Sequence, residues 1–266
     1  ETISQATECE TIVSLDTCYG ACDLAAYAAS QLKTDLLLHY GHAAWGGKPP
    51  ITTIYVEAFV SLDLSTVLPR MKKLLGDARR VGLLSTVQHI RQMKEVKEFL
   101  ERNGFNVMIG KASGRVRYDG QVLGCDYSTA KSILTTIDKF VLVGGGKFHA
   151  IGLALAVRKE SIVVDPYSNE VFTTEELLRR FLKSRHSCIM EARSASSYGI
   201  VVGLKYGQLD LQRPLSIKKG LLKYGKKVTL FSVDNLIPEQ LNIIEGIDAY
   251  VIVACPRMAI DDAELF

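Results

Sequence analysis

Residues 120–150 read GQVLGCDYSTAKSILTTIDKFVLVGGGKFHA: a turn with one cysteine, an expected helix, and an Asp-led apolar strand followed by a histidine. A similar order occurs earlier, at 11–43, in TIVSLDTCYGACDLAAYAASQLKTDLLLHYGHA, where an expected strand at 11–15 and a turn with Cys18 and Cys22 precede the helix, the Asp-led strand and the histidine. A third and less complete copy, at 226–259, reads KKVTLFSVDNLIPEQLNIIEGIDAYVIVACPRMA. Similar segments that recur at intervals of about a hundred residues indicate repeated structural units. Chance similarity between alternating helices and strands is the alternative interpretation.

Further strand and helix patterns precede the second and third copies, at 80–104 and 198–225. Short, continuous apolar strands that alternate with helices are typical of parallel sheets covered on both faces. We therefore predict an α/β fold of three homologous βαβαβ-type units, with parallel sheets around a pseudo-threefold centre. The predicted domains are 1–68, 69–172 and 173–266. The first copy lacks its opening strand and helix and begins at Glu1, so we expect the sequence to be part of something longer.

The composition argues against several classes of protein. The chain has 266 residues, of which 47% are hydrophobic and 23% charged, with a net charge of +3, so a strongly basic nucleic-acid binder is not indicated. Two basic runs, at 69–80 and 216–227, are interpreted as solvated helix faces. The apolar run at 149–157 is too short to span a membrane, and no secretory signal opens the chain. We expect a cytoplasmic, reducing setting.

The chain contains six cysteines, too few for a disulfide scaffold in a chain of this length: Cys9, Cys18, Cys22, Cys125, Cys188 and Cys255. No CxxC pair is present, which weakens the zinc-ribbon and thioredoxin-like alternatives. Cys18 and Cys22 have CxxxC spacing. In the usual radical enzymes that use S-adenosylmethionine, a third cysteine would follow where this sequence has Ala25.

Three of these cysteines are expected at one edge of the parallel sheets. Cys22 and Cys125 fall in the turn after the second strand of their copies, and Cys255 ends the last strand of its copy. Ligands of open α/β units bind beyond the carboxyl ends of the strands. Three soft thiolates suit a four-iron cluster with one open iron. Zinc would need a fourth ligand, which His42, His149 or a water could supply.

The cysteine segments DTCYGACD, GQVLGC and VACPRMAIDD resemble the three cluster-binding motifs of the diphthamide-synthesis radical enzymes, the 2-(3-amino-3-carboxypropyl)histidine synthases. HYGHA, GGKFHA, VDPYS and GIVVGLKYGQ also resemble blocks of that family, and CYGACD is similar to its archaeal homodimeric branch. The resemblance implies three α/β domains that each supply one cysteine to a 4Fe-4S cluster. Carried over by motif, those ligands are Cys22, Cys125 and Cys255.

The resemblance also implies a reaction and its partners. The 3-amino-3-carboxypropyl group of S-adenosylmethionine would be transferred by a radical mechanism to C2 of a histidine in the translocating elongation factor. Methylthioadenosine would be released, in the first step of diphthamide biosynthesis. The expected partners are the elongation factor, a second copy of the chain and an electron donor, with no membrane and no direct nucleic acid.

Three further residues are candidates for substrate binding: Gln208, Arg257 and His42. A guanidinium matches a carboxylate well, although Arg257 could equally form a salt bridge. Gln208 could instead start a helix. His42 and His149, each expected at the end of an equivalent strand, could be satisfied structural residues. Cys9, Cys18 and Cys188 are interpreted as ordinary packing or surface thiols.

Two alternative functions remain open at this point. One is an iron-sulfur dehydratase similar to quinolinate synthase, which also has three related α/β domains and three cysteines on one cluster. The other is a non-catalytic partner subunit that binds a cluster. A phosphate-binding loop at 144–147 is excluded, because Phe148 stands where the motif needs Ser or Thr.

Overall fold

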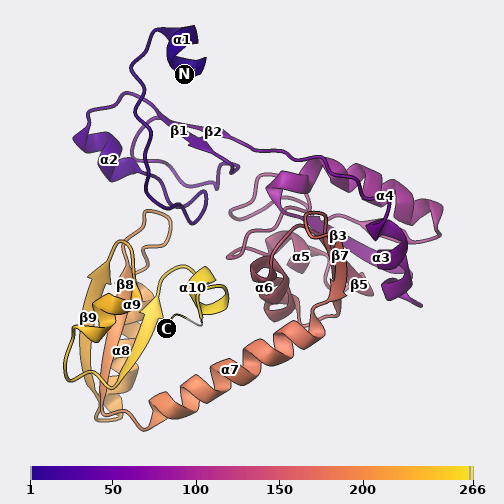
Figure 1. The fold of residues 1–266 in the computed structure, drawn as a ribbon. Helices are drawn as coiled ribbons and strands as arrows, with labels where there is room; N and C mark the ends of the chain where they lie inside the picture. Colours follow the sequence, from indigo (N-terminus) through magenta and orange to yellow (C-terminus); the bar gives the residue numbers. More distant parts are fainter. Residues whose placement is uncertain (1, 264, 266) are drawn as a thin grey trace.

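The computed structural model describes residues 2–263 and 265, which form three lobes, each with its own sheet (Figure 1). Five strands make up one sheet, three another and two the smallest. Neighbouring strands are parallel in every pair except β6 with β7, which confirms the α/β fold with parallel sheets. The relation of the three lobes by a pseudo-threefold axis stays a prediction.

The first lobe contains α1 (Thr2–Thr7), α2 (Ala26–Gln31), β1 (Leu37–Tyr40) and β2 (Thr53–Val56), with β1 parallel to β2. The expected strand at 11–15 is wrong. No described strand pairs with this segment, and Ile12, Val13 and Leu15 are between 56% and 95% exposed. An extended segment without a neighbour leaves its backbone groups to water, so the apolar residues alone do not make a strand.

The second lobe has the largest core. Its strand order is β4-β3-β5-β6-β7, and helices cover both faces of the sheet. Its elements are α3 (Val67–Leu75), β3 (Arg80–Ser85), the 3-10 helix η1 (Val87–Gln92), α4 (Met93–Arg102), β4 (Asn106–Met108), α5 (Ser128–Ser132), β5 (Lys139–Val143), α6 (Lys147–Val157), β6 (Ser161–Asp165) and β7 (Glu170–Thr173).

Alternate side chains of the central strands enter two separate cores. Val81 and Leu83 of β3 pack with α3 and α4, whereas Leu84 packs with α5 and α6 on the opposite face. In β5, Val141 packs in the core with α3 and α4, and Leu142 packs in the core with α5 and α6. Burial on both faces explains why these strands are continuous apolar runs in the sequence rather than alternating ones.

The third lobe follows α7 (Glu175–Arg193), a long helix that crosses from the second lobe to the third (Figure 1). It contains β8 (Ser197–Gly203), α8 (Gln212–Lys223), β9 (Lys227–Val233), α9 (Pro238–Asn242), β10 (Ala249–Val253) and α10 (Arg257–Ile260). The strand order is β10-β8-β9. Helix α10 lies between this sheet and the second lobe, where it contacts α6 (Figure 1).

The second and third lobes share one topology. In each, the first strand is central, the second lies on one side and the third on the other, as β4-β3-β5 and β9-β8-β10.

Each predicted domain range contains one sheet, although the limits at 68/69 and 172/173 cut α3 and β7. Those limits stay predictions. Within the described residues, no helix combines the length and hydropathy that a membrane crossing requires.

The repeated aspartate of the sequence has the same structural role in both lobes. Asp138 Oδ2 accepts hydrogen bonds from the backbone N–H groups of Arg79 and Arg80, each at 2.9 Å. Asp248 Oδ2 accepts from those of Ser196 and Ser197, also at 2.9 Å. Each carboxylate therefore joins the start of the third strand to the start of the central strand.

These hydrogen bonds predict an acid-dependent loss of stability. The Arg80 side chain and the two backbone donors hold the pKa of Asp138 well below its ordinary value. A lowered pKa in the folded state stabilises the fold above the unfolded pKa of about 4, and this contribution is lost as the pH falls further. Asp138→Asn is expected to lower the thermal unfolding midpoint at pH 7 and to lower it less at pH 3.

The matched control is Asp77→Asn, an exposed residue in the turn before β3, which should change the midpoint little at either pH. Circular dichroism at the two pH values measures both variants. An effect of Asp138→Asn that is as large at pH 3 as at pH 7 would show that the charge of the carboxylate is not responsible.

Candidate metal centre

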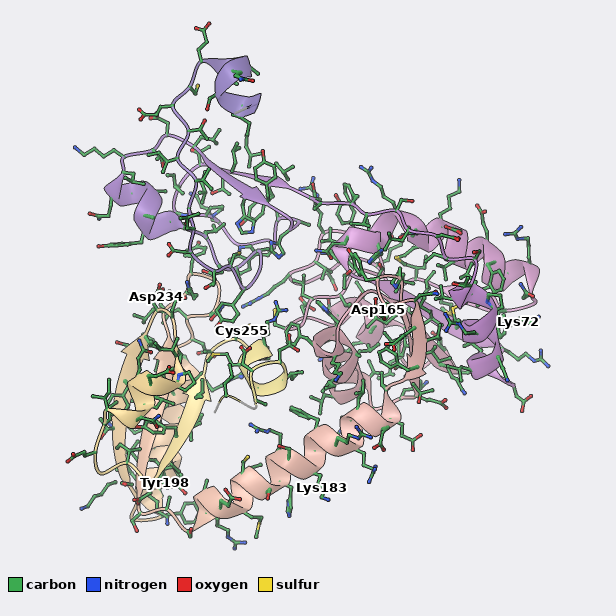
Figure 2. The ribbon with its side chains drawn as sticks, viewed as in Figure 1. Lys72, Asp165, Lys183, Tyr198, Asp234 and Cys255 are labelled. Atoms are coloured by element: carbon green, nitrogen blue, oxygen red, sulfur yellow. The ribbon has the colours of Figure 1, made fainter. Side chains whose placement is uncertain are left out.

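The three predicted cysteine ligands lie in turns at the ends of strands or before helices. Cys22 lies in the turn before α2, and Cys125 in a turn between β4 and α5. The Cys125 turn adjoins the carboxyl end of β3 through a bridge between Ser85 and Gln121. Cys255 lies between β10 and α10. Figure 2 shows Cys255 in the region where the three lobes face one another.

Cys22, Cys125 and Cys255 lie near enough to one another for the charge of one thiolate to affect the pKa of another. Burial raises the pKa of Cys22 to about 11, with further contributions from the charges of Cys125 and Cys255. Burial also raises the pKa of Cys255, and the charge of Cys125 adds to it. Partial desolvation raises the pKa of Cys125 as well, although the residue is exposed, and the nearby charge of Arg115 acts to lower it. Three thiolates without a cation are therefore unfavourable here.

A close contact between the first and third lobes holds Cys22. The backbone N–H of Gly207 donates to the carbonyl oxygen of Cys22 at 2.8 Å. A Cβ atom at residue 207 would overlap the Cβ of Cys22 and lie 2.8 Å from its Cα. Gln208 follows, with its amide Nε2 3.9 Å from the Cys22 Sγ. The loop after β8 can approach the cysteine turn this closely because residue 207 has no side chain.

A buried ion pair lies beside this contact. Lys205 Nζ lies 3.1 Å from Oδ1 of Asp23 and 3.5 Å from Oδ2 of Asp234, and the Lys205 and Asp23 side chains are 10% and 4% exposed. Burial acts to lower the pKa of Lys205, but the carboxylates of Asp23 and Asp234 together outweigh it and the pKa is raised. Asp23 also accepts from the backbone N–H of Tyr19 at 3.0 Å. The cysteine turn of the first lobe is thus fixed to the third.

Arg115 joins the second lobe to the other two. Its Nη1 donates to the carbonyl oxygen of Gly207 at 3.1 Å, and its guanidinium carbon lies 5.1 Å from the centre of the Trp45 ring. Its charge also acts to lower the pKa of the Cys125 thiol. One side chain therefore contacts all three lobes. No local sequence pattern marks Arg115 or Lys205, because their partners are distant in the sequence.

The remaining predicted residues lie in different surroundings. Arg257 begins α10, where its Nε lies 2.8 Å from Oδ2 of Asp261 and its guanidinium carbon 5.7 Å from the centre of the Phe148 ring. His149 does not end a strand, as expected, but lies in the first turn of α6. Burial and then the charge of Arg257 lower the pKa of His149 to about 4.

His42 follows β1 and faces a second histidine. Its Nδ1 lies 3.0 Å from Nε2 of His39, a buried residue of β1. Burial lowers the pKa of His42, and the charge of Arg257 lowers it further. Burial and then the charge of His42 lower the pKa of His39 to about 4. Both rings are therefore neutral at physiological pH.

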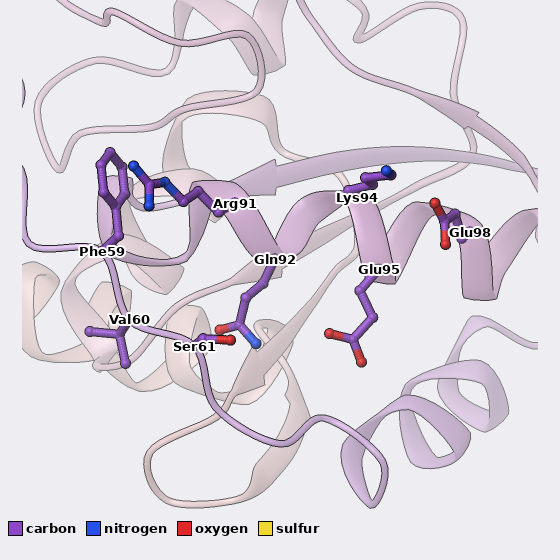
Figure 3. Close-up of a pocket in the computed structure, with 8 residues that line it drawn as sticks. All are labelled: Phe59, Val60, Ser61, Arg91, Gln92, Lys94, Glu95 and Glu98. Carbon is purple, nitrogen blue, oxygen red and sulfur yellow. The ribbon is translucent and has the colours of Figure 1, made fainter.

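A surface pocket of about 390 Å³ lies elsewhere, beside the first turns of α4 (Figure 3). Its wall includes Phe59 and Arg91, whose guanidinium carbon lies 3.7 Å from the centre of the Phe59 ring. None of the predicted site residues lines this pocket. We therefore place the candidate site at the three cysteines and not here.

The family model for diphthamide synthesis proteins matches residues 1–266. The chain belongs to the diphthamide synthesis family. It is 38% identical over 250 residues to the 2-(3-amino-3-carboxypropyl)histidine synthase of Pyrococcus horikoshii. The aligned residues make up 92% of this chain and 70% of that synthase. It is 30% identical over 262 residues to subunit 1 of the synthase of Schizosaccharomyces pombe, and spans 59% of that subunit.

The fold of this chain is similar to that of two solved structures of Dph2. The crystal structure of Dph2 from Pyrococcus horikoshii matches with a TM-score of 0.90 and 34% identity, over 98% of this chain and 75% of that one. A second structure of that protein, with a 4Fe-4S cluster, matches with the same TM-score over 76% of its length. The family resemblance found in the sequence is confirmed.

Substitution of Gly207 tests the contact that holds Cys22. Gly207→Ala is expected to lower the free energy of unfolding by about 1–3 kcal/mol, because the added methyl group overlaps the Cys22 side chain and the two loops must separate. Gly220→Ala is the matched control, since nothing lies within 4 Å of a Cβ atom there and the residue is inside α8.

The control substitution should leave the free energy of unfolding unchanged or raise it by about 0.5–1 kcal/mol. Urea unfolding followed by circular dichroism measures both. Equal stabilities of the two variants would contradict the close approach of Gly207 to Cys22.

Proposed function

We propose that this member of the diphthamide synthesis family is a 2-(3-amino-3-carboxypropyl)histidine synthase. It would transfer the 3-amino-3-carboxypropyl group of S-adenosylmethionine to C2 of a histidine in the translocating elongation factor, and release methylthioadenosine. The proposal rests on the placement of Cys22, Cys125 and Cys255, one from each lobe, near enough for their charges to interact, with Gly207 in contact with both Cys22 and Arg115. The names of the relatives in Pyrococcus and Schizosaccharomyces support it.

The donor set fits a 4Fe-4S cluster held by Cys22, Cys125 and Cys255. Thiolate sulfur is the ligand that such clusters prefer, and three ligands leave one iron open to a substrate. The raised pKa values of the thiols favour their protonated forms, so binding of a cationic centre would release protons. The bound cluster would supply one electron to the sulfonium of S-adenosylmethionine.

Protein side chains around the three thiols would orient the sulfonium. Which carbon–sulfur bond breaks depends on which one is held toward the centre, and that is an effect of positioning. We propose that Arg257 leaves its exposed partner Asp261 and pairs with the carboxylate of the substrate instead. Gln208, whose amide already reaches Cys22 Sγ, would donate to the same amino-acid moiety.

Several predictions about the setting remain part of this proposal: the homodimer, the electron donor and the cytoplasmic location. Family membership argues against the dehydratase similar to quinolinate synthase. The non-catalytic partner subunit is the second candidate, because several of the relatives are named as one subunit of the synthase.

The deciding experiment is an anaerobic turnover assay. The protein is reconstituted with iron and sulfide, mixed with S-adenosylmethionine and dithionite, and the released nucleoside is identified by mass spectrometry. Methylthioadenosine is the expected product. Cys22→Ser, Cys125→Ser and Cys255→Ser should each reduce it to the level without protein. Cys188→Ser is the control and should release as much as the unsubstituted protein, since this exposed thiol lies in α7.

Each other outcome overturns a specific part of the proposal. Deoxyadenosine would show that a different carbon–sulfur bond is held toward the centre. A complete cluster without cleavage of S-adenosylmethionine would favour the partner subunit. Full release by the three serine variants would show that these cysteines do not hold the cluster.

A further inference from the structure

A second group of metal-ligating side chains lies in the first lobe: Cys18, His39 and His42. One ligand atom of each, the Cys18 Sγ and one ring nitrogen of each histidine, lies within 4.8 Å of the other two. Nε2 of His39 and Nδ1 of His42 are 3.0 Å apart. None of these residues is among the three cysteines proposed to hold the cluster.

The separation of the two histidine nitrogens is close to that in a tetrahedral metal site. Zinc binds imidazole nitrogen at about 2.0–2.1 Å and thiolate sulfur at about 2.3 Å. Tetrahedral geometry with those bond lengths puts neighbouring ligand atoms about 3.3–3.6 Å apart. The 3.0 Å between the two histidine nitrogens is a few tenths of an ångström below that range, and the Cys18 Sγ lies within 4.8 Å of a ring nitrogen of each histidine. The three side chains are therefore near enough to move onto one ion.

We propose that Cys18, His39 and His42 bind one divalent metal ion of the zinc class, with a water or another small ligand in the fourth position. The ligand types select this class, since one thiolate and two imidazoles suit zinc and its neighbours, whereas calcium and magnesium prefer oxygen. Cys18 is exposed, so water can reach the proposed site and supply the fourth ligand.

The surrounding residues place the three ligands. His39 is 8% exposed, and its ring centre lies 5.3 Å from that of Tyr55 in the neighbouring strand β2. Sγ of Cys18 lies 3.4 Å from the carbonyl oxygen of Gly20 and 3.5 Å from that of Asp23, so the thiol is held inside its own turn. The alternative is a hydrogen bond between the two histidines with no metal, which the experiment below distinguishes.

A metal ion at this place would fix the turn that presents Cys22. The first lobe has a two-stranded sheet, and the side chains of residues 9–18 are exposed. Small units with so little buried apolar surface are commonly stabilised by a metal ion. An ion bound to Cys18 and to both histidines would join the cysteine turn to β1. This role does not depend on the proposed reaction.

Cobalt(II) is the probe, because tetrahedral cobalt with a thiolate ligand absorbs strongly in the visible and near-ultraviolet. It is titrated anaerobically into a variant in which Cys22, Cys125 and Cys255 are all replaced by serine, so that those thiols do not compete. We expect one cobalt ion per chain, with tetrahedral visible bands and a thiolate-to-cobalt charge-transfer band. Zinc should displace it.

Further substitutions in this background identify the ligands. Cys18→Ser should abolish the charge-transfer band and weaken binding by at least about 100-fold, since loss of an outer-shell partner alone costs 10–100-fold. His39→Gln should also weaken binding. Cys188→Ser is the control and should change neither. An octahedral spectrum, or equal affinity after Cys18→Ser, would overturn the proposal.

Should circular dichroism show that the triple variant does not fold, the same question is answered in the chain with its cluster thiols intact. After reconstitution with iron and sulfide and dialysis against zinc, elemental analysis counts zinc and iron separately. Cys18→Ser should lose one zinc per chain relative to Cys188→Ser and keep its iron. Equal zinc in both would overturn the zinc site. Loss of iron alone would count against the cluster ligands instead.

Discussion

The approach of the loop after β8 to the cysteine turn of the first lobe is the contact on which the candidate centre depends. Gly207 donates to the Cys22 carbonyl, and Lys205 pairs with Asp23 beside it. Because this ion pair is nearly excluded from water, loss of one partner would cost about 3–5 kcal/mol. Arg115 adds the second lobe through the Gly207 carbonyl. These contacts hold the cysteine turns of the three lobes near one another.

Much of the fold could be predicted because its signals are local. The apolar runs of β3, β5 and β8 are buried on both faces, which makes them continuous in the sequence. The repeated aspartates marked equivalent strands because each carboxylate holds the start of its lobe's central strand. The cysteine motifs carried the family resemblance, since a turn at the end of a strand keeps its residues together in the sequence.

The rest could not be predicted, for reasons that depend on contacts between distant residues. Ile12, Val13 and Leu15 have the composition of a strand, but no described strand pairs with them. His149 looked like the end of a strand, whereas α6 begins two residues before it. Arg115 and Lys205 act across lobes on partners about 90 and 180 residues away, and no local pattern marks such residues.

We propose that one cysteine from each lobe holds a single iron–sulfur centre. Crystallography of the anaerobically reconstituted protein, with anomalous data at the iron edge, tests it most directly. We expect one four-iron peak bonded to the Sγ atoms of Cys22, Cys125 and Cys255, with one iron that has no cysteine ligand. A cluster bonded to Cys18 in place of Cys22, or iron in only one lobe, would contradict it.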